Sequence, residues 1–198
     1  MDFMQIFTLV TGVMYLILEI RQKNFMWVVG IATSLAAMWV FFNQGLYASF
    51  GLNTYYLLTS FIGLWHWRHD KSQLTSDSGG TIHLNKLTWK AVVAAALIML
   101  AAVPALSLLM DLLASMGLKE NPMTGLDASV TVLSAIATWW LVKSYLAQWW
   151  LWIIADSLSV YICAAQGMYW MSLLYVAYVV GAVIGLLHWK RHGVVINK

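Results

Sequence analysis

The sequence predicts an all-α integral membrane protein with seven transmembrane helices, and three observations carry this prediction. The 198 residues are 62% hydrophobic and 10% charged, whereas soluble domains average about 45–50% apolar and about 25% charged residues. The apolar residues form continuous runs, not the alternating segments of a membrane-spanning barrel. When seven spans are assigned, all but one of the 11 lysines and arginines fall on one side. A bilayer forces such a chain to satisfy its backbone within helices.

The apolar runs are divided by short polar or glycine-containing separators and approach the roughly 20 residues that a spanning helix needs. The first run follows Asp2 without any preceding basic residue, so it is expected to be a retained span and not a signal peptide. The weakest divisions are the uncharged turns Gln44-Gly45 and Gln166-Gly167. The predicted spans are 3–20, 25–43, 46–67, 91–113, 126–142, 149–166 and 168–189.

The basic residues predict the orientation of the chain, because lysines and arginines near span ends are retained in the cytoplasm. We therefore expect the amino terminus outside and the carboxyl terminus in the cytoplasm. The outer side receives only Lys119. The predicted cytoplasmic side receives Arg21, Lys23, Arg68, Lys71, Lys86, Lys90, Lys143, Lys190, Arg191 and Lys198.

An internal repeat appears when the chain is shifted by 122 residues, which lays Gln44 to Trp67 over Gln166 to Trp189 with ten of 24 pairs identical. A basic residue follows each copy, so both copies are expected to end in the cytoplasm and to run parallel. This predicts a 3+1+3 arrangement, typical of transporters with a midplane substrate site; the alternative is a duplicated bundle without transport. The predicted divisions are a first three-helix repeat (1–67), a cytoplasmic loop (68–90), a linking helix with an outer loop (91–125), a second three-helix repeat (126–189) and a cytoplasmic tail (190–198).

The sixth predicted span carries the most informative polar residues. Gln148, Trp152, Asp156 and Ser159 recur at helical spacing and share one face. An ionisable group inside a span costs about 2.5–3.5 kcal/mol on insertion scales and marks a pathway or a pairing. Asp156 is therefore expected to face a substrate, or alternatively to make a structural hydrogen bond to another helix.

Aromatic and amide groups on other spans complete the predicted substrate site. Rings attract a cationic ligand by about 0.5–2 kcal/mol each, and a few hydrogen-bonding groups orient it. The alternative for each ring is packing or lipid contact. The predicted lining is Asn53, Tyr56, Gln148, Trp152, Asp156, Ser159, Tyr175 and Tyr178, with Trp27 and Trp39 as stacking platforms.

Several motifs resemble those of the Pnu family of bacterial vitamin-precursor transporters, and the resemblance extends from Asp2 to Trp189. The motifs are Trp27 to Gly30, Phe41 to Ala48, Gly63 to Trp67, Gln148 to Trp152, and Gly167 to Tyr169 with Leu174-Tyr175. The resemblance implies a fold similar to a full-length SWEET sugar transporter, a homotrimer in the bacterial inner membrane, and facilitated diffusion with trapping by phosphorylation inside the cell. No cofactor is expected, and the one-sided distribution of basic residues explains the net charge of +3 without a nucleic-acid partner.

The resemblance leaves the small cationic substrate open. Nicotinamide riboside comes first, because it defines the family. Asn53 and Thr33 depart from the nicotinamide riboside pattern, and the pair Leu18-Glu19 resembles the thiamine branch. Thiamine is therefore the second candidate, and riboflavin is transported by other members.

Two further classes of function remain as alternatives. A membrane enzyme would use Asp156 with His66 or His188, but no catalytic motif supports it. A sensory or structural bundle would need a cytoplasmic module, and the largest loop is too short to fold alone. The histidine pairs are expected to contact headgroups and not a metal, and Glu19 is expected to snorkel towards nearby bases.

Overall fold

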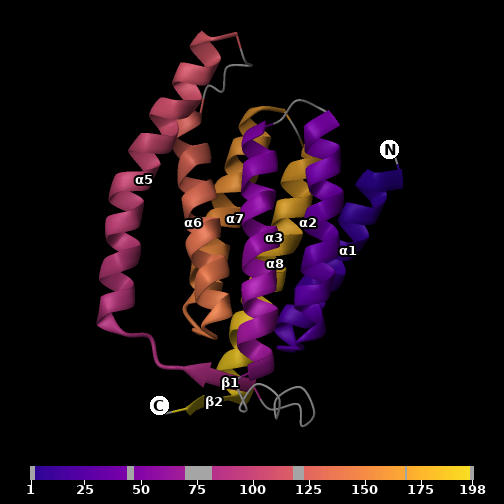
Figure 1. Cartoon of the computed structure of the whole chain (residues 1–198), viewed down its shortest axis with the longest axis vertical. Helices are drawn as coiled ribbons and strands as arrows, with labels where there is room; N and C mark the ends of the chain where they lie inside the picture. Colours follow the sequence, from indigo (N-terminus) through magenta and orange to yellow (C-terminus); the bar gives the residue numbers. More distant parts are fainter. Residues whose placement is uncertain (1–2, 44–46, 70–81, 118–122, 168, 197–198) are drawn as a thin grey trace. The chain divides into compact units, whose positions relative to one another are not determined.

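The computed structural model describes residues 3–43, 47–69, 82–117, 123–167 and 169–196. Seven α-helices lie in these ranges, which confirms the predicted number, and every helix end falls within about a turn of its predicted position. Two short strands were not predicted. The elements are α1 (Phe3–Ile20), α2 (Phe25–Asn43), α3 (Tyr47–His69), β1 (Ile82–Asn85), α5 (Trp89–Ser115), α6 (Thr124–Val142), α7 (Gln148–Ala165), α8 (Tyr169–His192) and β2 (Gly193–Ile196) (Figure 1).

Three of the described helices are long and apolar enough to cross a membrane, judged by length and composition. They are α5, α6 and the part of α8 from Met171 to His192. Shorter apolar stretches occupy Val10–Ile20 of α1 and Phe25–Trp39 of α2. The helix α5 has no buried residue along its 27 positions, as expected of an apolar helix whose solvent is lipid.

The chain divides into two compact units. Unit 1 comprises residues 1–86, 138–146 and 184–198, and unit 2 comprises residues 87–137 and 147–183. Unit 1 therefore contains α1, α2, α3, both strands and the carboxyl ends of α6 and α8. Unit 2 contains α5, α7 and the remainder of α6 and α8.

The packing of α2 against α3 in unit 1 is organised by a buried tryptophan pair. The rings of Trp27 and Trp67 meet edge to face with centroids 5.3 Å apart, an arrangement that aromatic pairs prefer. Gly63 allows this approach, because a Cβ on it would lie 2.6 Å from the Trp27 ring. The absence of a side chain at Gly63 is thus what lets the Trp27 ring rest on α3.

Substituting this glycine provides a direct test of the packing. Gly63→Ala should lower the free energy of unfolding by about 1–3 kcal/mol, the usual cost of overpacking a core. Gly51→Ala is the matched control on the same helix, since a Cβ there meets nothing within 4 Å, and it should be neutral or stabilising. Unfolding of the two purified variants in detergent would compare them; equal stability would contradict the packing.

Two tryptophan hydrogen bonds join helix ends in unit 1 with the same spacing along the chain. The Trp67 indole donates to the Val142 carbonyl at 3.0 Å, and the Trp189 indole donates to the Ile20 carbonyl at 3.0 Å. Both the donors and the acceptors are 122 residues apart. The ends of α1, α3, α6 and α8 therefore meet in unit 1 through contacts that repeat with the spacing found in the sequence.

The turns that follow α1 and α6 repeat in the same way. Gln22 and Ser144, also 122 residues apart, adopt positive φ values of 50° and 54°. The Gln22 amide donates to the Glu19 carbonyl at 2.9 Å, and the Ser144 amide donates to the Leu141 carbonyl at 2.8 Å. Outside glycine a left-handed residue is uncommon, so two of them at matching positions show that the two turns are built alike.

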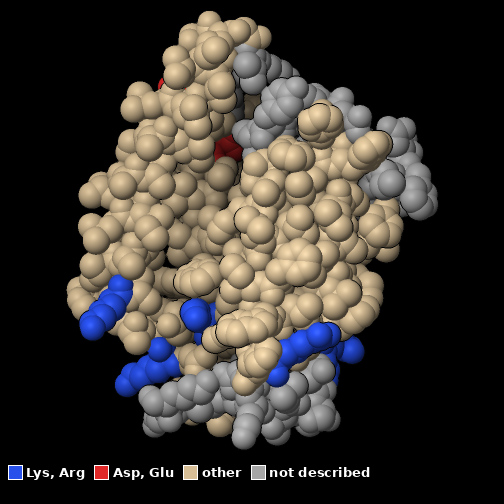
Figure 2. Space-filling view, viewed as in Figure 1, with Lys and Arg blue, Asp and Glu red and all other residues tan. Residues whose placement is uncertain are grey.

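One end of unit 1 is strongly basic, and we call it the basic end. Lys and Arg side chains gather there in the space-filling view (Figure 2). The strands β1 and β2 lie at this end as a two-stranded parallel sheet, with Ile82 opposite Gly193 and Asn85 opposite Ile196. The basic residues at or just after the helix ends that meet here are Arg21, Lys23, Arg68, Lys143, Lys190 and Arg191.

Candidate functional site

One face of α7 in unit 2 is polar and buried. Gln148, Asp156 and Ser159 have exposed fractions of 0%, 9% and 6%, and Trp152 between them is partly buried. The opposite face carries exposed apolar or aromatic groups, including Trp150 and Tyr161. A helix that turns its polar face inward and its apolar face outward suits a lipid surround and an interior polar site.

Several polar atoms on this face have unused hydrogen-bonding capacity. Among the described residues, neither polar atom of the Gln148 amide has a hydrogen-bond partner, and neither does the Trp152 indole nitrogen. Ser159 differs, because its hydroxyl donates to the Ala155 carbonyl at 3.0 Å within the helix. Buried polar groups are nearly always paired in native structures, so these atoms are available to hydrogen bond with a ligand or with water.

The unpaired amide leads to a prediction in which stability and binding move in opposite directions. Gln148→Met keeps the side-chain length and removes a buried group whose desolvation costs about 1–3 kcal/mol. We expect the ligand-free variant to melt at a higher temperature than the unsubstituted protein and to bind substrate more weakly. Thermal unfolding and tryptophan-fluorescence titration measure the two effects.

Gln166→Met is the matched control, because Gln166 is exposed after the end of the same helix. Gln166→Met should leave the melting temperature and the affinity for substrate unchanged. A lower melting temperature for Gln148→Met, with unchanged affinity, would show that the amide has a structural role.

The first half of α8 adds two tyrosines to the same unit. The hydroxyl of Ser172 donates to the Val160 carbonyl at 3.1 Å, which ties α8 to α7. The rings of Tyr175 and Tyr178 meet edge to face with centroids 6.1 Å apart. Both lie close enough to Asp156 to interact with its carboxylate electrostatically. The structure therefore brings together the predicted carboxylate and both predicted tyrosines.

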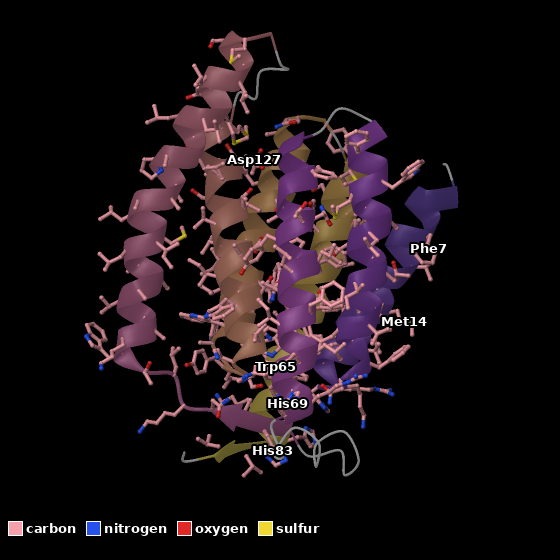
Figure 3. The ribbon with its side chains drawn as sticks, viewed as in Figure 1. Phe7, Met14, Trp65, His69, His83 and Asp127 are labelled. Atoms are coloured by element: carbon pink, nitrogen blue, oxygen red, sulfur yellow. The ribbon has the colours of Figure 1, made fainter. Side chains whose placement is uncertain are left out.

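Asp127 also interacts with residues of this unit, although it was not among the predicted site residues. It lies in the first turn of α6 (Figure 3) and interacts electrostatically with Tyr175 and Cys163. The structure shows that Asp127 and Asp156 both interact electrostatically with Tyr175.

The other predicted site residues belong to unit 1. Trp27 is fully buried against Gly63 and Trp67, so packing accounts for its position. Tyr56 is partly buried, and its ring contacts Tyr55 with centroids 6.0 Å apart. Asn53 is partly buried. Trp39 is 61% exposed, which agrees with the lipid-contact alternative for this ring.

The structure contradicts the expectation for Glu19, and it places the histidine pairs in contacts within their own helices. Glu19 is only 3% exposed, whereas a snorkelling carboxylate would reach the surface. The His192 ring contacts the His188 carbonyl, and the His69 ring contacts the Trp65 carbonyl, each within its own helix. Among the described residues no group of three potential metal ligands forms.

Comparison with known proteins identifies the family. A family model described as the nicotinamide mononucleotide transporter matches residues 2–191. The chain belongs to this family. The predicted resemblance to the Pnu transporters is thereby confirmed, and the family is one of transporters and not of enzymes, as predicted.

Curated relatives of this family member carry a more specific description. The chain is 29% identical over 136 residues to the nicotinamide riboside transporter PnuC of Haemophilus influenzae, covering 69% of the chain and 56% of that protein. It is 28% identical over 165 residues to the nicotinamide riboside transporter PnuC of Escherichia coli, covering 76% of the chain and 69% of that protein. The chain thus spans little more than half the length of the first of these relatives.

A solved structure shows the same fold. The crystal structure of the vitamin B3 transporter PnuC superposes with a TM-score of 0.67 at 21% identity, covering 94% of this chain and 81% of that one. The helical architecture of this family member is therefore that of a known transporter.

Proposed function

We propose that this protein carries nicotinamide riboside across the membrane by facilitated diffusion, with phosphorylation inside the cell trapping the substrate. The observation that carries the proposal is the buried face of α7, where a carboxylate, an indole and an unpaired amide lie within a transporter fold. The relatives described as nicotinamide riboside transporters support the choice of substrate.

The chemistry of the α7 face favours the riboside over the mononucleotide in the family's description. Nicotinamide riboside has a cationic pyridinium ring, an amide and ribose hydroxyls, which match the Asp156 carboxylate, the aromatic rings and the Gln148 amide. A phosphate would bring negative charge towards a buried carboxylate, and like charges repel strongly where water is excluded. The nucleotide should therefore bind much more weakly.

The same proposal includes a 3+1+3 arrangement of parallel repeats, similar to the SWEET transporters. In it α1 to α3 form the first repeat, α6 to α8 form the second, and α5 links them. The reciprocal hydrogen bonds of Trp67 and Trp189, and the matching turns at Gln22 and Ser144, support this arrangement. Parallel repeats of this kind place a substrate near the membrane midplane.

We propose that the basic end faces the cytoplasm, since positive residues are retained there. The amino terminus then lies outside the cytoplasmic membrane and the carboxyl terminus inside. A homotrimer is the proposed assembly. Cysteine labelling from either side, with cysteines introduced at exposed Arg68 and exposed Met116, would test the orientation.

Uptake into liposomes tests the function. Purified protein in liposomes should admit labelled nicotinamide riboside without ATP or an ion gradient, and nicotinamide mononucleotide should enter at least tenfold more slowly. Enclosing a nicotinamide riboside kinase with ATP should raise accumulation above the external concentration. Faster entry of thiamine would reassign the substrate within the family, and entry of none of these compounds would refute the proposal.

A further inference from the structure

The short strand β1 connects separate segments at the basic end of unit 1. It pairs with β2 over four residues, which attaches it to the chain directly after α8. Its alternate residues Ile82 and Leu84 are 1% and 5% exposed, so they are anchored in the interior of the unit. Gly193 makes this possible, because a Cβ there would collide with the Leu84 side chain and the Trp189 carbonyl.

The same strand contacts the turn between α1 and α2. The Gln22 side chain donates from Nε2 to the His83 carbonyl at 2.9 Å, and the His83 amide donates to Gln22 Oε1 at 2.8 Å. A single side-chain amide thus mimics a strand neighbour for His83, which is labelled in Figure 3. These two hydrogen bonds are side chain to main chain, unlike the main-chain ladder that β1 forms with β2.

Two residues further along, β1 contacts the turn between α6 and α7. The Asn85 amide donates to the Ser144 carbonyl at 3.1 Å, and Asn85 Nδ2 donates to the Lys143 carbonyl at 2.9 Å. Asn85 also forms a parallel bridge with Tyr145. Because Gln22 and Ser144 occupy matching positions in the two repeats, β1 crosses from a turn of one repeat to the equivalent turn of the other.

The attachments of β1 to the two repeats differ in kind. The second repeat holds it twice, through the ladder with β2 and through the Asn85 contacts with Lys143 and Ser144. The first repeat holds it through Gln22. If the two repeats separate at this end, the hydrogen bonds between Gln22 and His83 break together with the reciprocal tryptophan hydrogen bonds, while the attachments to the second repeat keep β1 in place.

We propose that the Gln22–His83 contact is a releasable latch that closes the basic end, and that β1 moves with the second repeat when this end opens. The inference rests on the proposed transport function, because a carrier built from two repeats exposes its site alternately at the two ends. The latch gives the closed state a specific contact that is lost on opening, which biases the equilibrium between the two states.

Cross-linking tests the latch in a Cys163→Ser background, which removes the one native cysteine. The pair Gln22→Cys with His83→Cys is joined by a short, reducible bis-methanethiosulfonate reagent. We expect uptake of nicotinamide riboside into liposomes to fall at least tenfold after cross-linking and to recover on reduction. Undiminished uptake in the fully cross-linked protein would overturn the latch.

The pair Asn85→Cys with Tyr145→Cys is the matched control, because it ties the same strand to the second repeat across an existing bridge. Cross-linking it should change uptake less than twofold. A block by this pair and not by the first would show that β1 moves with the first repeat and would overturn the proposal. Failure of every reduced variant and of the unsubstituted protein to transport would instead refute the proposed function.

A single-residue variant tests the contact without cross-linking. Gln22→Glu keeps the shape but replaces the Nε2 donor by an oxygen that repels the His83 carbonyl. We expect amide hydrogen exchange at His83 to rise at least fivefold, while exchange at Asn85, whose amide donates to Ser144, stays unchanged. Unaltered exchange at His83 would show that Gln22 does not hold the strand.

Discussion

Asp156→Asn should lower the affinity for nicotinamide riboside about 10- to 150-fold, because a hydrogen bond or contact with a charged group contributes about 1.5–3 kcal/mol. The carboxylate is 9% exposed, and no described residue pairs with it. The substitution keeps the shape of the side chain and removes its charge. Isothermal titration calorimetry with purified protein measures the loss.

A structural role for Asp156 makes a different prediction, and two measurements separate the roles. If the carboxylate serves the cation, the ligand-free Asn variant should be at least as stable as the unsubstituted protein, because a lone buried charge is lost. It should also discriminate less between nicotinamide riboside and its uncharged dihydro form. A less stable variant with unchanged discrimination would assign the residue to helix packing.

Asp111→Asn is the matched control for this substitution. Asp111 is exposed on α5, so the same chemical change occurs at a site where water or headgroups solvate the charge. Its affinity for nicotinamide riboside should stay within about twofold of the unsubstituted value, well below a 1 kcal/mol change. A loss as large as that of Asp156→Asn would indicate a general effect of net charge.

Trp67→Ala and Trp189→Ala should each lower the free energy of unfolding by about 3–5 kcal/mol, the cost of truncating a large buried ring. The two rings are 1% and 0% exposed, and each indole hydrogen bonds to the end of a helix from the other proposed repeat. Because the contacts are equivalent, the two losses should be similar. Denaturation in detergent, followed by circular dichroism, measures them.

Trp65→Ala is the control, since Trp65 lies two residues before Trp67 and is 64% exposed. Its effect should stay within about 0.5 kcal/mol, as for surface substitutions. Losses that differ widely between Trp67→Ala and Trp189→Ala would contradict the equivalence of the two contacts and weaken the case for two repeats.

The helices could be predicted closely from the sequence, because continuous apolar runs bounded by polar turns leave a backbone in lipid little choice but to form helices. The polar face of α7 was predictable for a related reason, since Gln148, Trp152, Asp156 and Ser159 repeat with helical spacing. The structure adds that Gln148 and Trp152 have unpaired polar atoms. Periodicity reports which residues share a face, but not which of their atoms are satisfied.

The two strands were beyond prediction from sequence. Ile82 to Asn85 and Gly193 to Ile196 are four-residue segments far apart in the chain, and segments this short lack a distinguishing pattern. Their pairing depends on a contact across more than a hundred residues and on the space left by Gly193. The burial of Glu19 depends likewise on neighbours that its own helix does not reveal.

The sequence by itself determined the helical membrane architecture, the family and the 122-residue spacing, because apolar periodicity and repeated motifs are local properties of the chain. Only the tertiary structure decided that the spacing recurs as reciprocal contacts, Trp67 to Val142 and Trp189 to Ile20, and that β1 crosses between two equivalent turns. Such contacts join residues distant in the chain, so they depend on how helices pack and not on what each helix contains.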